Sequence, residues 1–102
     1  MNQTLELLLP GLTDEFPNIL QVILHEPSQK YGCYYYDGVH GLACFRDDES
    51  AKRFCDQLDK TGMKMIQVSF DEAREIAKAR PMPVVSIMLM DSQSDPLIHY
   101  VR

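Results

Sequence analysis

Clustered cysteines and paired histidines are missing from this 102-residue sequence. Its three cysteines, Cys33, Cys44 and Cys55, are spaced eleven residues apart and form no CxxC pair. Zinc sites need such clusters of ligands, so we expect neither a metal nor another cofactor. An odd number of cysteines without a signal peptide indicates free thiols in a reducing compartment, and we therefore expect a cytoplasmic protein.

The sequence also has no excess of positive charge and no long apolar run. Ten Lys and Arg residues accompany fifteen Asp and Glu residues, which gives a net charge of −5. Nucleic-acid binding needs a local excess of Lys and Arg, and here these residues alternate with acidic ones, so we expect no nucleic-acid partner. The longest apolar run, residues 84–90, is too short for a membrane span.

The composition that remains is that of one globular domain. Hydrophobic residues make up 45% of the chain and charged residues 25%, and 102 residues leave no room for a second core. We expect an N-terminal leader over residues 1–17, which docks on the domain or contacts a partner, and a single α+β domain over residues 18–102.

Strands are predicted in the first half of the domain. Residues 19–24 are rich in β-branched side chains and predict a buried strand. Residues 33–36 and 39–45 flank Asp37-Gly38, and Asp-Gly between two β-prone segments predicts a hairpin, because a type I′ turn needs positive φ at both central positions.

The first helix is predicted to begin at Asp47-Asp48-Glu49, where carboxylates can cap free backbone N–H groups. Gly62 is placed for the C′ position after this helix. Apolar residues recur between these points at the spacing of one helix face: Ala51, Phe54, Cys55 and Leu58.

A strand over residues 63–68, with Ile66 and Val68 on one face, leads into the second helix. Ser69-Phe70-Asp71-Glu72 has the pattern of a capping box, in which the first and last residues each satisfy a backbone donor. Pro81 ends this helix.

Two further β-prone segments, residues 84–90 and 97–101, are joined by a predicted turn over residues 91–96. The resulting order is β, β-hairpin, α, β, α, β, β. This order predicts a ferredoxin-like α+β sandwich or a close variant, with a mostly antiparallel sheet, both helices on one face, an N-terminal leader and a C-terminal hairpin.

No residue pattern indicates catalysis. The clustered carboxylates lie at helix starts, where capping accounts for them. Cys44 and His40 share a strand face, but at the usual rise they lie about 13 Å apart, too far for a hydrogen bond. We therefore predict no catalytic residue and no enzyme; a thiol pKa well below about 8.5 would be the contrary sign.

The tyrosines are the most unusual cluster in the sequence. Tyr34 and Tyr36 share one face of the predicted strand, and Tyr35 takes the other. Three hypotheses remain open for the pair: cross-strand packing within the sheet, contact with a partner, and binding of a small flat ligand.

The stretch Gly41-Leu42-Ala43-Cys44-Phe45-Arg46-Asp47-Asp48-Glu49-Ser50-Ala51-Lys52-Arg53-Phe54, with Leu58, Gly62 and residues 68–76, resembles an uncharacterised domain family of cyanobacteria and plastids. Members carry an apolar strand ending in Phe, an acidic turn, an Ala-x-Arg-Phe helix, and a strand leading into an acidic second helix. The resemblance covers residues 19–78. It implies an α+β fold and a photosynthetic host, and it assigns no catalytic residue.

Two functional hypotheses follow. The first is a non-enzymatic interaction or regulatory domain that binds another protein or itself, as a homo-oligomer. Its contact is expected at the apolar strand 84–90, with Ile87 and Met88, because an open sheet edge or face tends to be covered. The alternative is a small-ligand sensor with Tyr34, Tyr36 and His99 around a pocket.

Overall fold

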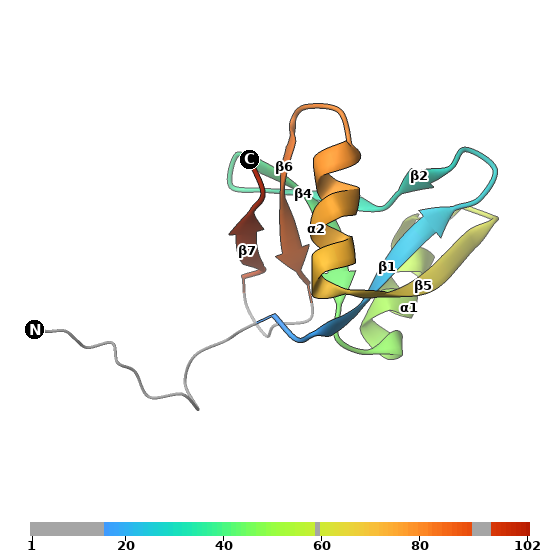
Figure 1. Cartoon of the computed structure of the whole chain (residues 1–102). Coiled ribbons are helices and arrows are strands. Elements are labelled where there is room, and N and C mark those ends of the chain that lie inside the picture. The colour runs from blue at the N-terminus through green and yellow to red at the C-terminus, as the bar shows by residue number, and fades with distance from the viewer. Residues whose placement is uncertain (1–15, 59, 91–94) are drawn as a thin grey trace, which may run out of the picture.

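The computed structural model describes residues 16–58, 60–90 and 95–102. They form a seven-stranded mixed sheet with one helix on each face (Figure 1). The fold class is therefore α+β, as the sequence predicts. In chain order the elements are β1 (Ile19–His25), β2 (Lys30–Tyr31), β3 (Cys33–Tyr36), β4 (Val39–Phe45), α1 (Asp48–Leu58), β5 (Met63–Ser69), α2 (Phe70–Ala79), β6 (Val84–Leu89) and β7 (Leu97–Tyr100).

The order of the strands places β1, β4 and β6 inside the sheet and β5 and β7 at its margins. β5 pairs with β1 along its whole length, from Ile19 opposite Ser69 to His25 opposite Met63. The other side of β1 pairs first with β4 and then with β2, while β3 pairs with the start of β4. The pairing of β4 with β6 is parallel and the other pairings are antiparallel.

The two helices lie on opposite faces of the sheet, so the prediction of both helices on one face is wrong. Alternate residues of β4 show this: Leu42 packs in the cluster that contains α2, whereas Ala43 packs with Ala51 of α1. Figure 1 shows α2 in front of the sheet and α1 behind it. The four apolar residues that end β4 are all buried, as expected for a strand covered on both faces.

The topology also differs from a ferredoxin-like sandwich. That fold places a helix between its first two strands, whereas β1 is followed here by β2 and the β3–β4 hairpin. The short 26–29 segment returns the chain beside β1 as β2, and Gly32, between β2 and β3, bonds to both Ile23 of β1 and Ala43 of β4. Beyond this junction β4 pairs directly with β1 in the antiparallel sense. Both helices then follow later strands, and each covers a different face.

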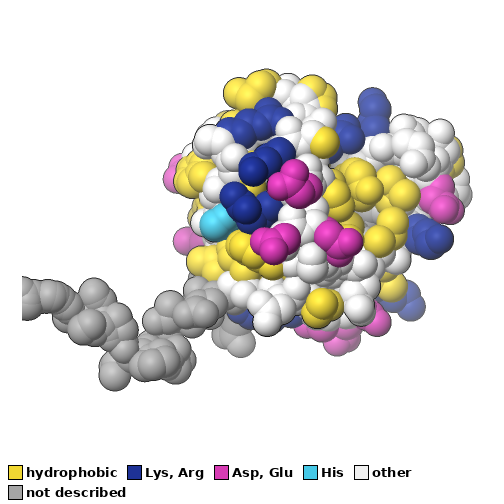
Figure 2. Space-filling view, viewed as in Figure 1, with side chains coloured by type: hydrophobic (Ala, Val, Ile, Leu, Met, Phe, Trp, Pro, Cys, Tyr) yellow, Lys and Arg dark blue, Asp and Glu magenta, His cyan; other side chains and the backbone are white. Residues whose placement is uncertain are grey.

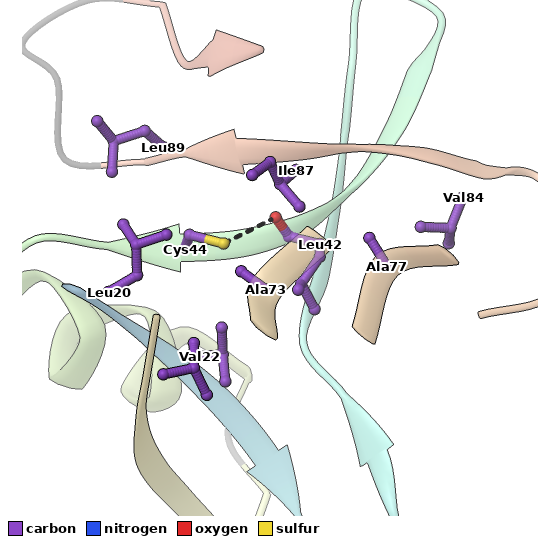
Figure 3. Packing of buried hydrophobic residues seen from close by; sticks show 10 residues of the cluster. Leu20, Val22, Leu42, Cys44, Ala73, Ala77, Val84, Ile87 and Leu89 are labelled. Atoms are coloured by element: carbon purple, nitrogen blue, oxygen red, sulfur yellow. Dashed lines mark hydrogen bonds between the residues drawn. The ribbon is translucent and has the colours of Figure 1, made fainter. Parts of the chain in front are cut away.

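The larger core cluster lies between α2 and the sheet (Figure 3). Small residues of α2, Ala73 and Ala77, let the helix approach the strands closely, and both are fully buried. The side chains opposite them come from the three inner strands and include Leu20, Val22, Leu42, Cys44, Ile87 and Leu89. Replacing one of these large residues by Ala would cost about 2–5 kcal/mol of unfolding free energy.

The local signals at the hairpin and the helix starts are confirmed. Asp37 and Gly38 both have positive φ, 49° and 83°, as a type I′ turn requires. Ser50 donates its backbone N–H to Asp47 Oδ1 at 2.8 Å, so Asp47 caps α1. Ser69 and Glu72 form the reciprocal capping box of α2, with distances of 3.0 and 2.7 Å.

The predicted C′ role of Gly62 is wrong. α1 ends at Leu58, four residues earlier, and Gly62 lies in the turn that leads into β5. Its φ is +83°, and a Cβ at this position would lie 2.7 Å from Pro27 Cδ. Glycine is therefore needed here by the turn and by the close approach of the 25–29 loop.

Two predictions fall largely outside the described residues. The leader 1–17 is described only at positions 16 and 17, and the 91–96 turn only at positions 95 and 96. Phe16, at the end of the leader, packs with Phe70 and His99 beside α2, at ring distances of 5.7 and 6.0 Å. Among the described residues, no helix is long and apolar enough to cross a membrane.

Candidate functional site

A row of four residues crosses β3, β4, β6 and β7 on the face opposite α2. Tyr34 lies opposite Gly41, Gly41 beside Ser86, and Ser86 opposite Tyr100. Directly opposite residues of neighbouring strands point to the same side of a sheet. The sheet therefore brings together Tyr34 and Tyr100, which are far apart in sequence.

The middle of this row is small and buried, and its ends are large and exposed. Ser86 is fully buried, whereas Tyr34 is 38% and Tyr100 57% exposed. Ser86 donates its hydroxyl to the carbonyl oxygen of His40 at 3.1 Å, which satisfies the buried polar group. We call the part of this sheet face that carries Tyr34, Tyr36 and Tyr100, above the buried Gly41 and Ser86, the tyrosine face.

The first helix does not extend over the exposed tyrosines. α1 packs on β1, β4 and β5, next to Ile23, Ala43 and Phe45. Ala43 lies two residues beyond Gly41 on the same face of β4. One half of this face is therefore covered by α1, and the other half carries the tyrosine face.

Carboxylates border the tyrosine face. The Tyr36 hydroxyl donates a hydrogen bond to the Asp95 carboxylate, and this bond is the main reason why the pKa of Tyr36 is raised. Desolvation and the negative charges of Asp95 and Asp37 raise the same pKa further. A positive group that approaches Tyr36 would therefore meet a favourable local potential.

The other predicted site residues are not part of this surface. Ile87 and Met88 have no exposed surface, because β6 is an inner strand and not an open edge. His99 lies on the α2 face, with its ring 5.1 Å from that of Phe70. Tyr34 and Tyr36 thus share a face as predicted, but His99 does not join them around a pocket.

A separate hollow of about 210 Å³ lies near the end of β1. His25 Nδ1 and Ser28 Oγ are 2.6 Å apart at its wall, so the two side chains hold each other in place. The lining residues are His25, Ser28, Lys30, Tyr31, Gly32, Cys33, Leu58, Lys60 and Met63, and none of them belongs to the tyrosine face.

The thiols of Cys33 and Cys55 lack the lowered pKa of a catalytic cysteine. Cys33 is exposed as a residue, but partial desolvation of its thiol raises its pKa, and the nearby positive charge of Arg80 offsets this only in part. Burial also raises the pKa of Cys55, with a further contribution from Asp56. In the part of the chain that the structure describes, no group of three His, Cys, Asp or Glu residues could hold a metal ion.

Sequence reasoning identified Tyr34 and Tyr36 but missed Gly41, Ser86 and Tyr100. Alternation along residues 97–101 places Tyr100 and Ile98 on one face, yet it does not indicate which strand lies beside them. Comparison of the chain with models of known protein families and with curated proteins finds no match.

Proposed function

We propose that this protein is a non-enzymatic protein-binding domain and that its tyrosine face binds a basic segment of a partner protein. The observation that carries the proposal is the row of Tyr34 and Tyr100 on either side of the buried Gly41 and Ser86. A cytoplasmic location is part of the proposal, because the chain carries three free cysteines.

The residue types of this surface suit a protein contact. Tyrosine is enriched where binding energy concentrates, since its ring buries a large area with little loss of side-chain freedom and its hydroxyl can donate a hydrogen bond. The backbones of Tyr34 and Tyr100 are each held by pairing with an inner strand, β4 and β6 respectively. Binding would therefore order few additional groups, which lowers its entropic cost.

The charge around the face selects the partner. Asp37 and Asp95 lie close enough to Tyr36 to raise its pKa, and the whole chain carries a net charge of −5. A partner segment with Lys or Arg beside its apolar residues would gain both attraction and faster association. This contribution should weaken as added salt screens the exposed carboxylates.

The resemblance of residues 41–54, with Leu58, Gly62 and residues 68–76, to an uncharacterised domain family of cyanobacteria and plastids remains a proposal of the same kind. The residues that carry it lie in β4, α1, the turn before β5, the end of β5 and α2. Apart from Gly41 they lie outside the tyrosine face. The resemblance thus concerns the scaffold and assigns no partner.

Selection from a library of random displayed peptides tests the proposal. We expect enriched peptides to combine Lys or Arg with apolar residues and to bind the wild-type protein more weakly at high salt. The Tyr34→Ala/Tyr100→Ala double variant should lose this binding. Tyr35→Ala is the matched control, because Tyr35 is 60% exposed on the other face, where its ring packs on His40 at 4.6 Å.

The outcomes separate the hypotheses. Binding that survives in Tyr35→Ala and is lost in the double variant supports the tyrosine face. Equal binding by both variants, selection of acidic peptides, or no enriched peptide from a folded protein would overturn the proposal. Circular dichroism of each variant shows whether a loss of binding comes from unfolding.

A further inference from the structure

In the described part of the chain, no strand pairs with the outer side of β5. Within the described residues, β5 pairs with β1 alone, and the register of its seven residues is continuous. Natural edge strands are usually protected by proline, bulges, several charges or short length. β5 has no proline and a single charged residue, Lys64, which forms an ion pair with Glu26 at 3.7 Å. The opposite margin, β7, has only four residues.

The hydrogen bonds at both ends of the β1–β5 pair show which backbone groups point outward. Phe70 N–H donates to Asn18 O at 2.8 Å, and Glu26 N–H donates to Gly62 O at 2.9 Å. Both bonds continue the register of the strands, so even-numbered residues of β5 bond to β1. The N–H and C=O groups of odd-numbered residues, Met65 and Gln67 among them, therefore face away from β1, although the N–H of Ser69 already donates to Glu72 Oε1 in the capping box.

This geometry is compatible with one full-length pairing between two copies of the strand. A two-fold axis perpendicular to the sheet keeps α2 on the same side in both copies, so residues that pair must share a face. The sequence numbers of two residues that pair must then add to an even sum. The axis therefore passes between the two copies of one residue, which pair with each other. Only an axis at Ile66 pairs all of Met63–Ser69.

We propose that a second copy of this chain pairs antiparallel with β5, about a two-fold axis at Ile66, and joins the two sheets into one. In this register Met65 and Gln67 of each copy exchange backbone hydrogen bonds through their outward-facing groups. The central Ile66 pair is of the close, non-hydrogen-bonded type, with Cα atoms about 4.5 Å apart.

Side chains along the edge fit this occupant. Lys64 of one copy lies opposite Val68 of the other, so no like charges face each other directly. Ile66 lies on the α2 face, where Figure 2 shows a hydrophobic area beside α2 over β1 and β5. Ile66 and Tyr31 are partly buried against the core cluster on this face, and pairing places a second Ile66 beside the first.

The main test uses a proline at an outward-facing position. Gln67→Pro removes an N–H that takes no part in the β1–β5 ladder, so the fold should remain while pairing is lost. Gln67→Ala keeps that N–H and is the matched control. In sedimentation equilibrium we expect the wild type and Gln67→Ala to approach twice the 11.7 kDa chain mass with rising concentration, and Gln67→Pro to stay at the chain mass.

A cysteine cross-link tests the register, in a Cys33→Ser background because Cys33 is exposed. Ile66→Cys should form a disulfide between copies under mild oxidation, because the expected Cα separation suits a disulfide. Lys64→Cys is the control: its two copies lie about 14 Å apart at the usual strand rise, beyond disulfide reach.

Three results would overturn the inference. The first is a wild-type mass that stays at 11.7 kDa up to about 1 mM protein. At that concentration even a dimer with a dissociation constant of about 1 mM would raise the measured mass. The second is a folded Gln67→Pro variant that still dimerises. The third is cross-linking of Lys64→Cys at least as fast as that of Ile66→Cys.

Discussion

Gly41 lies at the centre of the sheet, where the structure leaves no room for a side chain. A Cβ at this position would lie 2.5 Å from Ser86 Oγ and 2.7 Å from Met88 Cγ. Neither neighbour can move away freely, because both are fully buried and Ser86 is bonded to the carbonyl oxygen of His40. We therefore expect Gly41→Ala to destabilise the protein even though alanine has the higher strand propensity.

The expected cost follows from two contributions. Overpacking a buried site costs about 1–3 kcal/mol. Displacing the Ser86 hydroxyl from the His40 carbonyl adds about 1 kcal/mol for a lost buried hydrogen bond. The sum is about 2–4 kcal/mol of unfolding free energy, which for a chain of this length lowers the midpoint of thermal unfolding by roughly 10–20 °C.

Denaturant unfolding of Gly41→Ala, Ser86→Ala and the double variant measures this effect. If contact with the Ser86 hydroxyl is the cause, the double variant should be less destabilised than the sum of the single variants. Gly38→Ala is a control for backbone strain alone, since its φ is +83° and no atom lies within 4 Å of the added Cβ. A Gly41→Ala cost below about 0.5 kcal/mol, the size of an ordinary surface effect, would refute the reasoning.

Three further predictions concern single groups. Ser69→Ala removes the cap of α2 and should lower the unfolding free energy by about 1 kcal/mol in urea titration, and no loss would contradict the capping box. The hydrogen bond to Asp95 raises the pKa of Tyr36 above its ordinary 10.0. The bond should therefore stabilise the folded protein below about pH 10, and this stabilisation should be lost as the pH rises through the pKa of Tyr36 in the folded state. Tyr36→Phe should therefore flatten the alkaline decline of the thermal midpoint, and an unchanged profile would argue against the bond. Cys33 should alkylate slowly at neutral pH and faster above pH 9.0, while the buried Cys44 should react only on unfolding, as measured by mass spectrometry.

Features encoded by neighbouring residues could be predicted from the sequence. The Asp37-Gly38 turn needs only two adjacent positions with positive φ, and both have it. The capping box of α2 depends on two residues three positions apart, Ser69 and Glu72. Such local chemistry indicates where strands and helices lie without reference to any tertiary contact.

Features that depend on distant segments could not be predicted in the same way. The apolar run at residues 84–90 predicts an open sheet edge or face, although an unbroken apolar run is also typical of a strand buried on both faces. In the structure β6 lies between β4 and β7, which buries Ile87 on one face and Met88 on the other. The error came from the order of the strands and not from their location.

The candidate site divides along the same line. Tyr34 and Tyr36 belong to one strand, so their common face follows from alternation alone. Tyr100 joins them through three consecutive pairings that involve Gly41 and Ser86. Those registers are set by packing across strands far apart in sequence, and no local pattern reports them.

The two proposed surfaces are compatible because they lie at opposite margins of the sheet. β5 forms one margin, and β7, which carries Tyr100, forms the other. A two-fold axis perpendicular to the sheet would keep both tyrosine faces on the same side of the joined sheet. A partner with two basic segments could then bind both copies at once, and its apparent affinity would exceed that of either segment alone. Loss of pairing in Gln67→Pro should accordingly weaken binding of a two-segment partner while leaving binding of a single segment unchanged, since position 67 lies outside the tyrosine face.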